Sequence, residues 1–258
     1  MSRGPLVALA LISLFSAATA RGAATWLMEN PGTTQHVPAI STNQTTGELM
    51  AGMSVTAFFS DAMEETAIWA PTGGLDAGAA VGADGDWSLS QSGDTYIEPW
   101  RLEYTQTGKG NLIHLRLDGL ASGVVSDAVL FDRSTDVSGN HYGTPGSQFG
   151  RDFVTIPDPY PAGFEINVGY TDQVKLDTDA AGPRGDLYRF LDLYFRFRES
   201  IDSVVYGEVG MDGVDVSEMI FRQDTDSTSM VPEPAGCLLL GLGTVMAGCC
   251  CRRRQSTG

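Results

Sequence analysis

Short stretches with a two-residue hydrophobic period recur along this chain, and they limit its fold more than any other feature. In the clearest one, Ile113, Leu115 and Leu117 alternate with three polar residues. Similar stretches lie at 55–59, 67–69, 87–90, 100–105, 129–131 and 164–170, separated by clusters of Gly, Asp, Ser and Pro. Side chains alternate faces along a strand, so each stretch buries one face and exposes the other. We therefore predict an all-β fold, an antiparallel β-sandwich of jelly-roll type in one domain.

Four further segments are less clear-cut. Residues 187–198 fit one face of a helix or one face of a strand, and their aromatic content favours the strand. Residues 204–206 and 219–221 are interpreted as the last strands. Residues 32–47 are rich in Thr, Gln, Asn and Pro and predict a polar loop or an irregular edge strand. Residues 224–230 are interpreted as a polar spacer.

The first 20 residues have the pattern of a secretory leader. Arg3 provides a positive start, residues 6–15 are apolar but too few to span a bilayer, and Ala18 and Ala20 form a small-x-small cleavage site. The mature chain is therefore expected to begin near Arg21. The predicted export leads us to expect a body outside the cytoplasm, at residues 21–230.

The last 28 residues, 231–258, form a second predicted signal. Val231, Pro232, Glu233 and Pro234 precede an apolar run at 235–251, and Arg252, Arg253 and Arg254 follow it. The apolar run can enter a bilayer as a helix, and the arginines hold its end on the cytoplasmic side. Proline fixes φ and removes amide donors, so the Pro-Glu-Pro segment is expected to be extended and exposed.

In position, order and charge, this tail resembles the PEP-CTERM sorting signal. The resemblance implies a Gram-negative bacterium, an exosortase partner in the inner membrane, transient anchoring, and cleavage near Pro-Glu-Pro before release or transfer to the cell surface. An ordinary C-terminal membrane anchor after a proline-rich hinge is the alternative. Short matches such as Thr66-Ala67-Ile68-Trp69 and Trp87-Ser88-Leu89-Ser90 are also similar to exported β-sandwich proteins with this tail. That group has no assigned activity.

The net charge limits the possible partners of the chain, and the positions of the cysteines limit its possible disulfides. The whole chain carries a net charge of −16, and residues 21–230 hold 12 basic against 31 acidic residues, a difference of −19. Such a surface repels nucleic acid and suits solubility or divalent cations. All four cysteines lie in the tail, at 237 and 249–251. A disulfide framework is therefore not expected in the exported body.

Patterns typical of enzymes are missing from the sequence. Neither a Gly-x-Ser-x-Gly elbow nor a His-Glu-x-x-His motif occurs, and the histidines are His36, His114 and His141. We interpret His114 as a surface residue of its strand, while His141 lies in a loop where binding is conceivable. Carboxylate pairs are abundant, but a glycosidase needs two at a fixed separation across a cleft. We therefore expect neither catalytic residues nor an enzyme.

Calcium is the one cofactor that the acidic segments suggest, and no other is expected. Its candidate ligands are Asp84, Asp86, Asp224 and Asp226. Calcium takes six to eight oxygen ligands in flexible geometry. Asp84-Gly85-Asp86 resembles the start of a calcium loop but lacks the remaining ligand positions, and turn formation by Asp and Gly is the preferred interpretation.

Trp26, Tyr96, Tyr142 and Tyr160 are aromatic residues that could stack on sugar rings or pack locally. We accordingly expect a structural or interaction protein of the cell surface or matrix, associated with extracellular polysaccharide. A carbohydrate-binding module, with or without calcium, is the alternative, and a glycan-acting enzyme is a third interpretation.

Overall fold

The computed structural model describes residues 24–105, 109–121, 128–133, 150–156, 164–177, 187–200, 203–206 and 218–230. The predicted leader, the predicted tail and His141 lie outside these residues. The described chain is all-β apart from one short 3-10 helix, η1 (Glu48–Met50). No helix in the described part of the chain combines the length and apolarity that a bilayer crossing requires.

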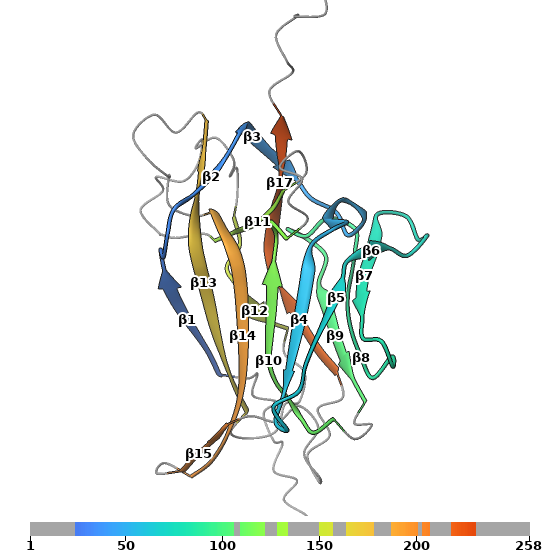
Figure 1. The fold of residues 1–258 in the computed structure, drawn as a ribbon, viewed down its shortest axis with the longest axis vertical. Coiled ribbons are helices and arrows are strands. Elements are labelled where there is room, and N and C mark those ends of the chain that lie inside the picture. The colour runs from blue at the N-terminus through green and yellow to red at the C-terminus, as the bar shows by residue number, and fades with distance from the viewer. Residues whose placement is uncertain are drawn as a thin grey trace, which may run out of the picture.

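The strands form two sheets, both largely antiparallel (Figure 1). The larger sheet follows the order β3-β17-β11-β14-β10-β4-β5, with β13 beside β14, with β1 and β2 beside β13, and with β15 on β14. Its strands are β1 (Ala24–Asn30), β2 (Gln35–Val37), β3 (Ala39–Gln44), β4 (Ser54–Phe59), β5 (Glu64–Ile68), β10 (Leu112–Asp118), β11 (Val129–Asp132), β13 (Phe164–Leu176), β14 (Leu187–Ser200), β15 (Ser203–Tyr206) and β17 (Asp224–Met230).

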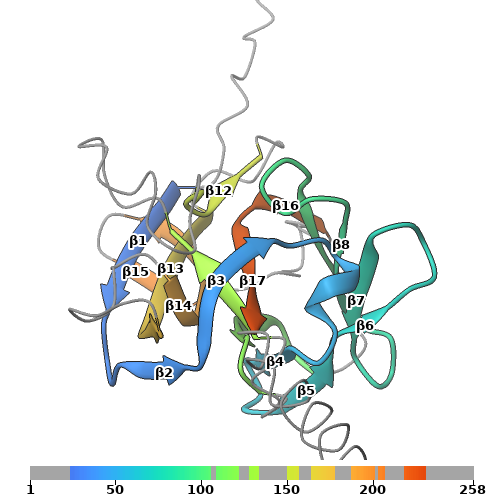
Figure 2. The same ribbon diagram turned by 90° about the horizontal axis from the view of Figure 1, so that it is seen from above.

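The smaller sheet follows the order β12-β16-β9-β8-β7-β6. Its strands are β6 (Ala70–Pro71), β7 (Ala77–Val81), β8 (Trp87–Ser92), β9 (Trp100–Tyr104), β12 (Val154–Thr155) and β16 (Glu218–Arg222). Figure 2, seen from above, shows β6, β7, β8 and β16 on the side of the molecule away from β1, β13 and β14.

One hydrophobic core joins the two sheets in a sandwich-like arrangement. Inward residues of β4, β10, β13 and β14 pack with those of β8, β9 and β16. Aromatic residues dominate the centre: Trp100 lies 5.4 Å from Trp69 and 5.8 Å from Phe221 between ring centroids. The indole N–H groups of Trp69 and Trp100 donate to the backbone oxygens of Gly47 and Gln223, at 2.7 and 2.8 Å. These wide apolar rings are therefore buried without leaving their polar atoms unsatisfied.

The two-residue period correctly identified most strands. Burial alternates strictly along β4 and along β9, as expected for strands with one face toward the core. Residues 187–198 are strand, within β14, so the helical alternative is wrong. Residues 35–37 and 39–44 form β2 and β3, which agrees with the edge-strand interpretation of 32–47. Two pairings are parallel rather than antiparallel, those of β1 and β2 with β13.

The interpretation of residues 224–230 as a spacer is wrong. They form β17, which pairs with β11 on one side and β3 on the other. Asp224, Thr225, Asp226 and Thr228 are buried, and Thr225 hydrogen-bonds Thr95 across the sandwich. Composition failed here because polar side chains with tertiary hydrogen-bond partners can fill an interior strand position.

Candidate functional site

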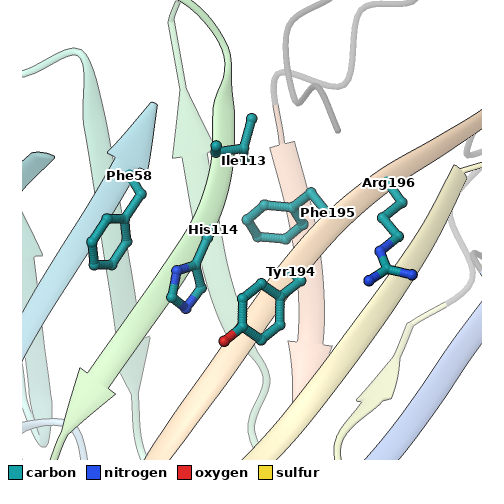
Figure 3. Close-up of a pocket in the computed structure, with 6 residues that line it drawn as sticks. All are labelled: Phe58, Ile113, His114, Tyr194, Phe195 and Arg196. Carbon is teal, nitrogen blue, oxygen red and sulfur yellow. The ribbon is translucent and has the colours of Figure 1, made fainter. Parts of the chain in front are cut away.

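A row of stacked rings crosses the outer face of the larger sheet. Phe58 of β4, His114 of β10 and Tyr194 of β14 lie opposite one another in the strand registers. The rings of Phe58 and His114 are 4.5 Å apart between centroids, and those of His114 and Tyr194 are 4.1 Å apart, with interplanar angles of 9° and 12°. Figure 3 shows the three rings side by side, one from each strand. Because their faces contact each other, the row presents mainly ring edges to its surroundings.

Charged groups form a paired network next to this row. Asp192 of β14 accepts from His114 Nε2 at 2.7 Å and from Arg116 Nε and Nη2 at 2.7 and 3.2 Å. Burial raises the pKa of Asp192, but the hydrogen bonds from His114 and Arg116 outweigh it and hold that pKa below its usual value. Further along β10 and β14, Arg189 donates to both carboxylate oxygens of Asp118, at 2.8 and 2.7 Å. The network fixes His114 and keeps this face locally balanced in charge.

A pocket of about 340 Å³ lies where β10 and β14 separate. Residue Ile113 is a β-bulge, since Leu112 pairs with Phe59 and His114 already pairs with Phe58. The ladder between β10 and β14 begins only at His114–Tyr194. The pocket walls are almost wholly apolar, and Arg196 lies beside Tyr194 at their edge (Figure 3). The lining residues are Phe58, Ile113, His114, Tyr194, Phe195 and Arg196.

The same row continues across β13 to the exposed strand β1. Asn167 lies opposite Tyr194 on one side and opposite Trp26 on the other. The Asn167 side-chain oxygen, assigned from its surroundings, accepts from the three guanidinium nitrogens of Arg196 at 2.8–3.1 Å. Trp26 is 56% exposed. Across the strands, one face of the sheet therefore carries first an exposed indole, then an amide–guanidinium pair, and then an apolar pocket.

A second group of interest is buried on the opposite part of the larger sheet. Asp132 of β11 and Asp224 and Asp226 of β17 have carboxylate oxygens within 4.8 Å of one another. Asp224 accepts from the Thr95 hydroxyl at 3.1 Å and Asp226 from the Thr42 hydroxyl at 2.5 Å. Burial raises the pKa of Asp224 to about 7, against the hydrogen bond from Thr95 and with added repulsion from Asp94. These three residues, two of them predicted candidates, could offer oxygen ligands to a calcium ion.

The other two calcium candidates have a different partner. The ammonium group of Lys109 lies 3.0 Å from Asp84, 3.1 Å from Asp86 and 2.9 Å from Glu65. Hydrogen bonds to Glu65 and then to Asp84 raise the pKa of Lys109. The lysine therefore supplies the positive charge that a calcium ion would bring to these carboxylates, and Asp84 and Asp86 do not meet Asp224 or Asp226 in one site.

The remaining predicted positions are scattered. His36 pairs with Asp177 at 2.8 Å on an exposed edge. The guanidinium carbon of Arg151 lies 4.5 Å from the centroid of the Tyr96 ring. Tyr96 therefore packs against a side chain of the protein itself. Tyr142, Tyr160 and the cleavage and sorting residues lie outside the described residues. His114 is less exposed than a typical surface residue, because Phe58 and Tyr194 cover both ring faces.

Sequence reasoning missed Asp132, Asp192 and Tyr194. Asp132 closes an apolar run at 129–131, and Asp192 and Tyr194 take outward positions once 187–198 is read as strand. The end of the apolar run and the outward strand positions can both be recognised in the sequence. Only the pairing of distant strands, however, brings these three residues to their partners. Comparison of the chain with protein-family models, with curated proteins and with solved structures found no match.

Proposed function

We propose that this chain is an exported structural or interaction protein, sorted at the inner membrane through its C-terminal PEP-CTERM-like tail and acting at the cell surface or in an extracellular polysaccharide matrix. In this proposal residues 1–20 are removed, exosortase is the sorting partner, and the body is a β-sandwich of jelly-roll type without catalytic activity.

One observation carries the proposal: the described strands lie between the two predicted signals and form paired sheets. β1 begins at Ala24, four residues after the proposed cleavage at Ala20, and β17 ends at Met230, directly before Val231. β17 pairs on both edges, so it belongs to the body. Cleavage at Val231 or beyond would remove the tail and leave in place every pairing between the strands that the structure describes.

The test follows the size and location of the full chain in cells with and without exosortase. We expect a shorter product outside the inner membrane when the enzyme is present, and a longer membrane-associated product when it is absent. Replacing Arg252, Arg253 and Arg254 by Gln should cause escape or mislocalisation, whereas replacing them by Lys keeps the charge and should preserve sorting. Recovery of the protein in the cytosol with both ends intact would contradict the proposal.

Glycan binding is the second candidate function, and the exposed row of the larger sheet favours it. An apolar pocket beside hydrogen-bonding side chains is the usual composition of a ligand site. Calcium assistance remains a prediction for Asp224 and Asp226. A glycan-acting enzyme has the least support, because Asp192 and Asp118, two carboxylates on the same face, are each bonded to an arginine.

A further inference from the structure

We propose that the outer face of the larger sheet binds a neutral oligosaccharide that runs across the strands, with one sugar ring over Trp26 and another in the pocket beside Tyr194. This inference rests on the glycan-binding function proposed above and names its site and its substrate class. The site combines β1, β13, β14 and β10, which follow one another across the sheet (Figure 1).

The two ends of the site are apolar. Trp26 exposes 56% of its surface on β1, and the pocket at the other end has apolar walls and a volume of about 340 Å³. Sugar rings present C–H faces that such surfaces bind, and an indole offers the widest aromatic surface among side chains. Tyr194 and Trp26 lie in one row with a single strand between them, so they are about 10 Å apart. An oligosaccharide can cover that span, and a single sugar cannot.

The middle of the site is polar. Asn167 and Arg196 lie between the two ends; Asn167 is buried and bonded to Arg196, whose half-buried guanidinium is the polar group nearest the surface. A purely apolar partner would bury these groups without offering them new hydrogen bonds, which is unfavourable. Sugar hydroxyls can accept from the guanidinium of Arg196 in place of water, while Asn167 holds that guanidinium in position from below. The alternation of apolar, polar and apolar surface therefore matches a glycan better than a hydrophobic peptide.

Two ion pairs of this face and the net charge of the chain favour a neutral glycan. Arg116 is paired with Asp192, and Arg189 is paired with Asp118. The chain as a whole carries a net charge of −16, which opposes the approach of an anionic polymer. Hydroxyl groups can bind to such paired charges without adding an unpaired one.

The stacking of the rings predicts which of them matters most. Phe58 and Tyr194 each contact His114 face to face, so Phe58 contributes a ring edge to the far wall of the pocket. Trp26 has no such arrangement with these three rings and is the most exposed aromatic residue of the row. Loss of the Trp26 ring should therefore weaken binding more than loss of the Phe58 ring.

The test uses the full-length chain in a detergent without a sugar headgroup. The probes are cellohexaose, xylohexaose and maltohexaose, with glucose as the single-ring comparison, and the measurements are calorimetric titration and tryptophan fluorescence. We expect at least one hexasaccharide to bind and glucose to bind at least about ten-fold more weakly. Trp26→Ala should reduce the affinity about ten-fold or more, and Trp26→Phe less. Leu75→Ala, which removes an 88% exposed side chain elsewhere, should leave binding unchanged.

Several results would overturn the inference. These are no binding of any of the three hexasaccharides, equal affinity of Trp26→Ala and the unaltered chain, or equal losses in Trp26→Ala and Leu75→Ala. A dimer that dissociates in Trp26→Ala, seen by sedimentation, would instead assign this face to a second copy of the chain. The sorting proposal assigns export to the two terminal segments, so Trp26→Ala should reach the same location as the unaltered chain. Failure of the glycan site is thereby separated from failure of the sorting proposal.

Discussion

Two acidic clusters in this protein each gather three carboxylates, and they differ in what balances the charge. Around Lys109, the carboxylates of Glu65, Asp84 and Asp86 surround a built-in ammonium group. On β11 and β17, Asp132 lies directly opposite Asp224 in the strand register, with Asp226 two residues further on the same face. Like charges directly opposite in a sheet repel each other.

The difference is visible in the pKa values. Burial raises the pKa of Glu65, but hydrogen bonds from the Ala83 amide, Lys109 and Trp87 outweigh that effect and lower it overall. For Asp224, burial dominates and raises the pKa to about 7. The lysine and its neighbours therefore favour the ionised form of Glu65, whereas burial favours the protonated form of Asp224.

The largest expected effect is the loss of the lysine. Lys109→Met keeps an apolar stem near Phe59 but leaves three carboxylates facing one another, so we expect the melting temperature to fall by about 5–10 °C. Calorimetry at pH 7 measures it. Lys175→Met is the matched control, since it removes the same charge from β13, and should change the melting temperature little. Similar melting temperatures for the two variants would show that the cluster does not depend on Lys109.

A smaller effect is expected from Asp224→Asn, and it should depend on pH. The folded-state pKa of Asp224, about 7, lies above the unfolded value of about 4, so its stabilising contribution is complete below about pH 4 and is lost as the pH rises through 7. Asparagine keeps an oxygen for Thr95 without the charge. We expect the variant to be more stable than the unaltered chain at pH 8, by about 1–3 kcal/mol, and nearly equal at pH 4.

Denaturant titrations across this pH range provide the measurement. Asp192→Asn is the control of opposite sign, because the pKa of Asp192 is lowered and its contribution is lost as the pH falls. That variant should therefore be destabilised at neutral pH. If Asp224→Asn retained the full pH dependence of the unaltered chain, the titrating group would have to be another residue.

The calcium prediction for Asp224 and Asp226 is tested in melts with calcium and with EDTA. A cation that binds the folded state raises the melting temperature by mass action, and only ionised carboxylates are good ligands. Calcium binding at this cluster should therefore stabilise the chain more at pH 8 than at pH 6, by a few degrees, and not stabilise Asp224→Asn. Identical melts with calcium and with EDTA at pH 8 would remove calcium from the account of this protein.

The smallest effect is expected within the lysine cluster. The Asp84 side chain is 72% exposed, whereas that of Asp86 is fully buried. Because exposed ion pairs contribute little, Asp84→Asn should shift the melting temperature by about 1 °C or less, and Asp86→Asn by more. The two variants are compared in one calorimetric series. An equal shift would mean that burial does not govern the strength of these contacts.

Parts of this fold follow from the sequence alone. The two-residue period of stretches such as 54–59 reports which side chains face the core, because the alternation of faces is a local property of an extended backbone. In 112–118 the prediction holds for Leu115 and Leu117 but is wrong for Ile113, because the bulge there places Leu112 in the core instead. The all-β class and most strands could therefore be predicted. The polar strand 224–230 could not, since its hydrogen-bond partners, Thr42 and Thr95, come from distant segments.

The sequence by itself determined the all-β class, the acidic character of the body and the presence of two terminal signal patterns, because each depends on composition or on near neighbours in the chain. Only the tertiary structure decided that Asp84 and Asp86 meet Lys109, that Asp132 joins Asp224 and Asp226, and that Trp26, Asn167 and Tyr194 share one row. Strand pairing is the physical reason. It joins residues far apart in the chain: Ala39 pairs with Met230, and Trp26 and Tyr194 both pair with Asn167. No local pattern encodes which strands become neighbours.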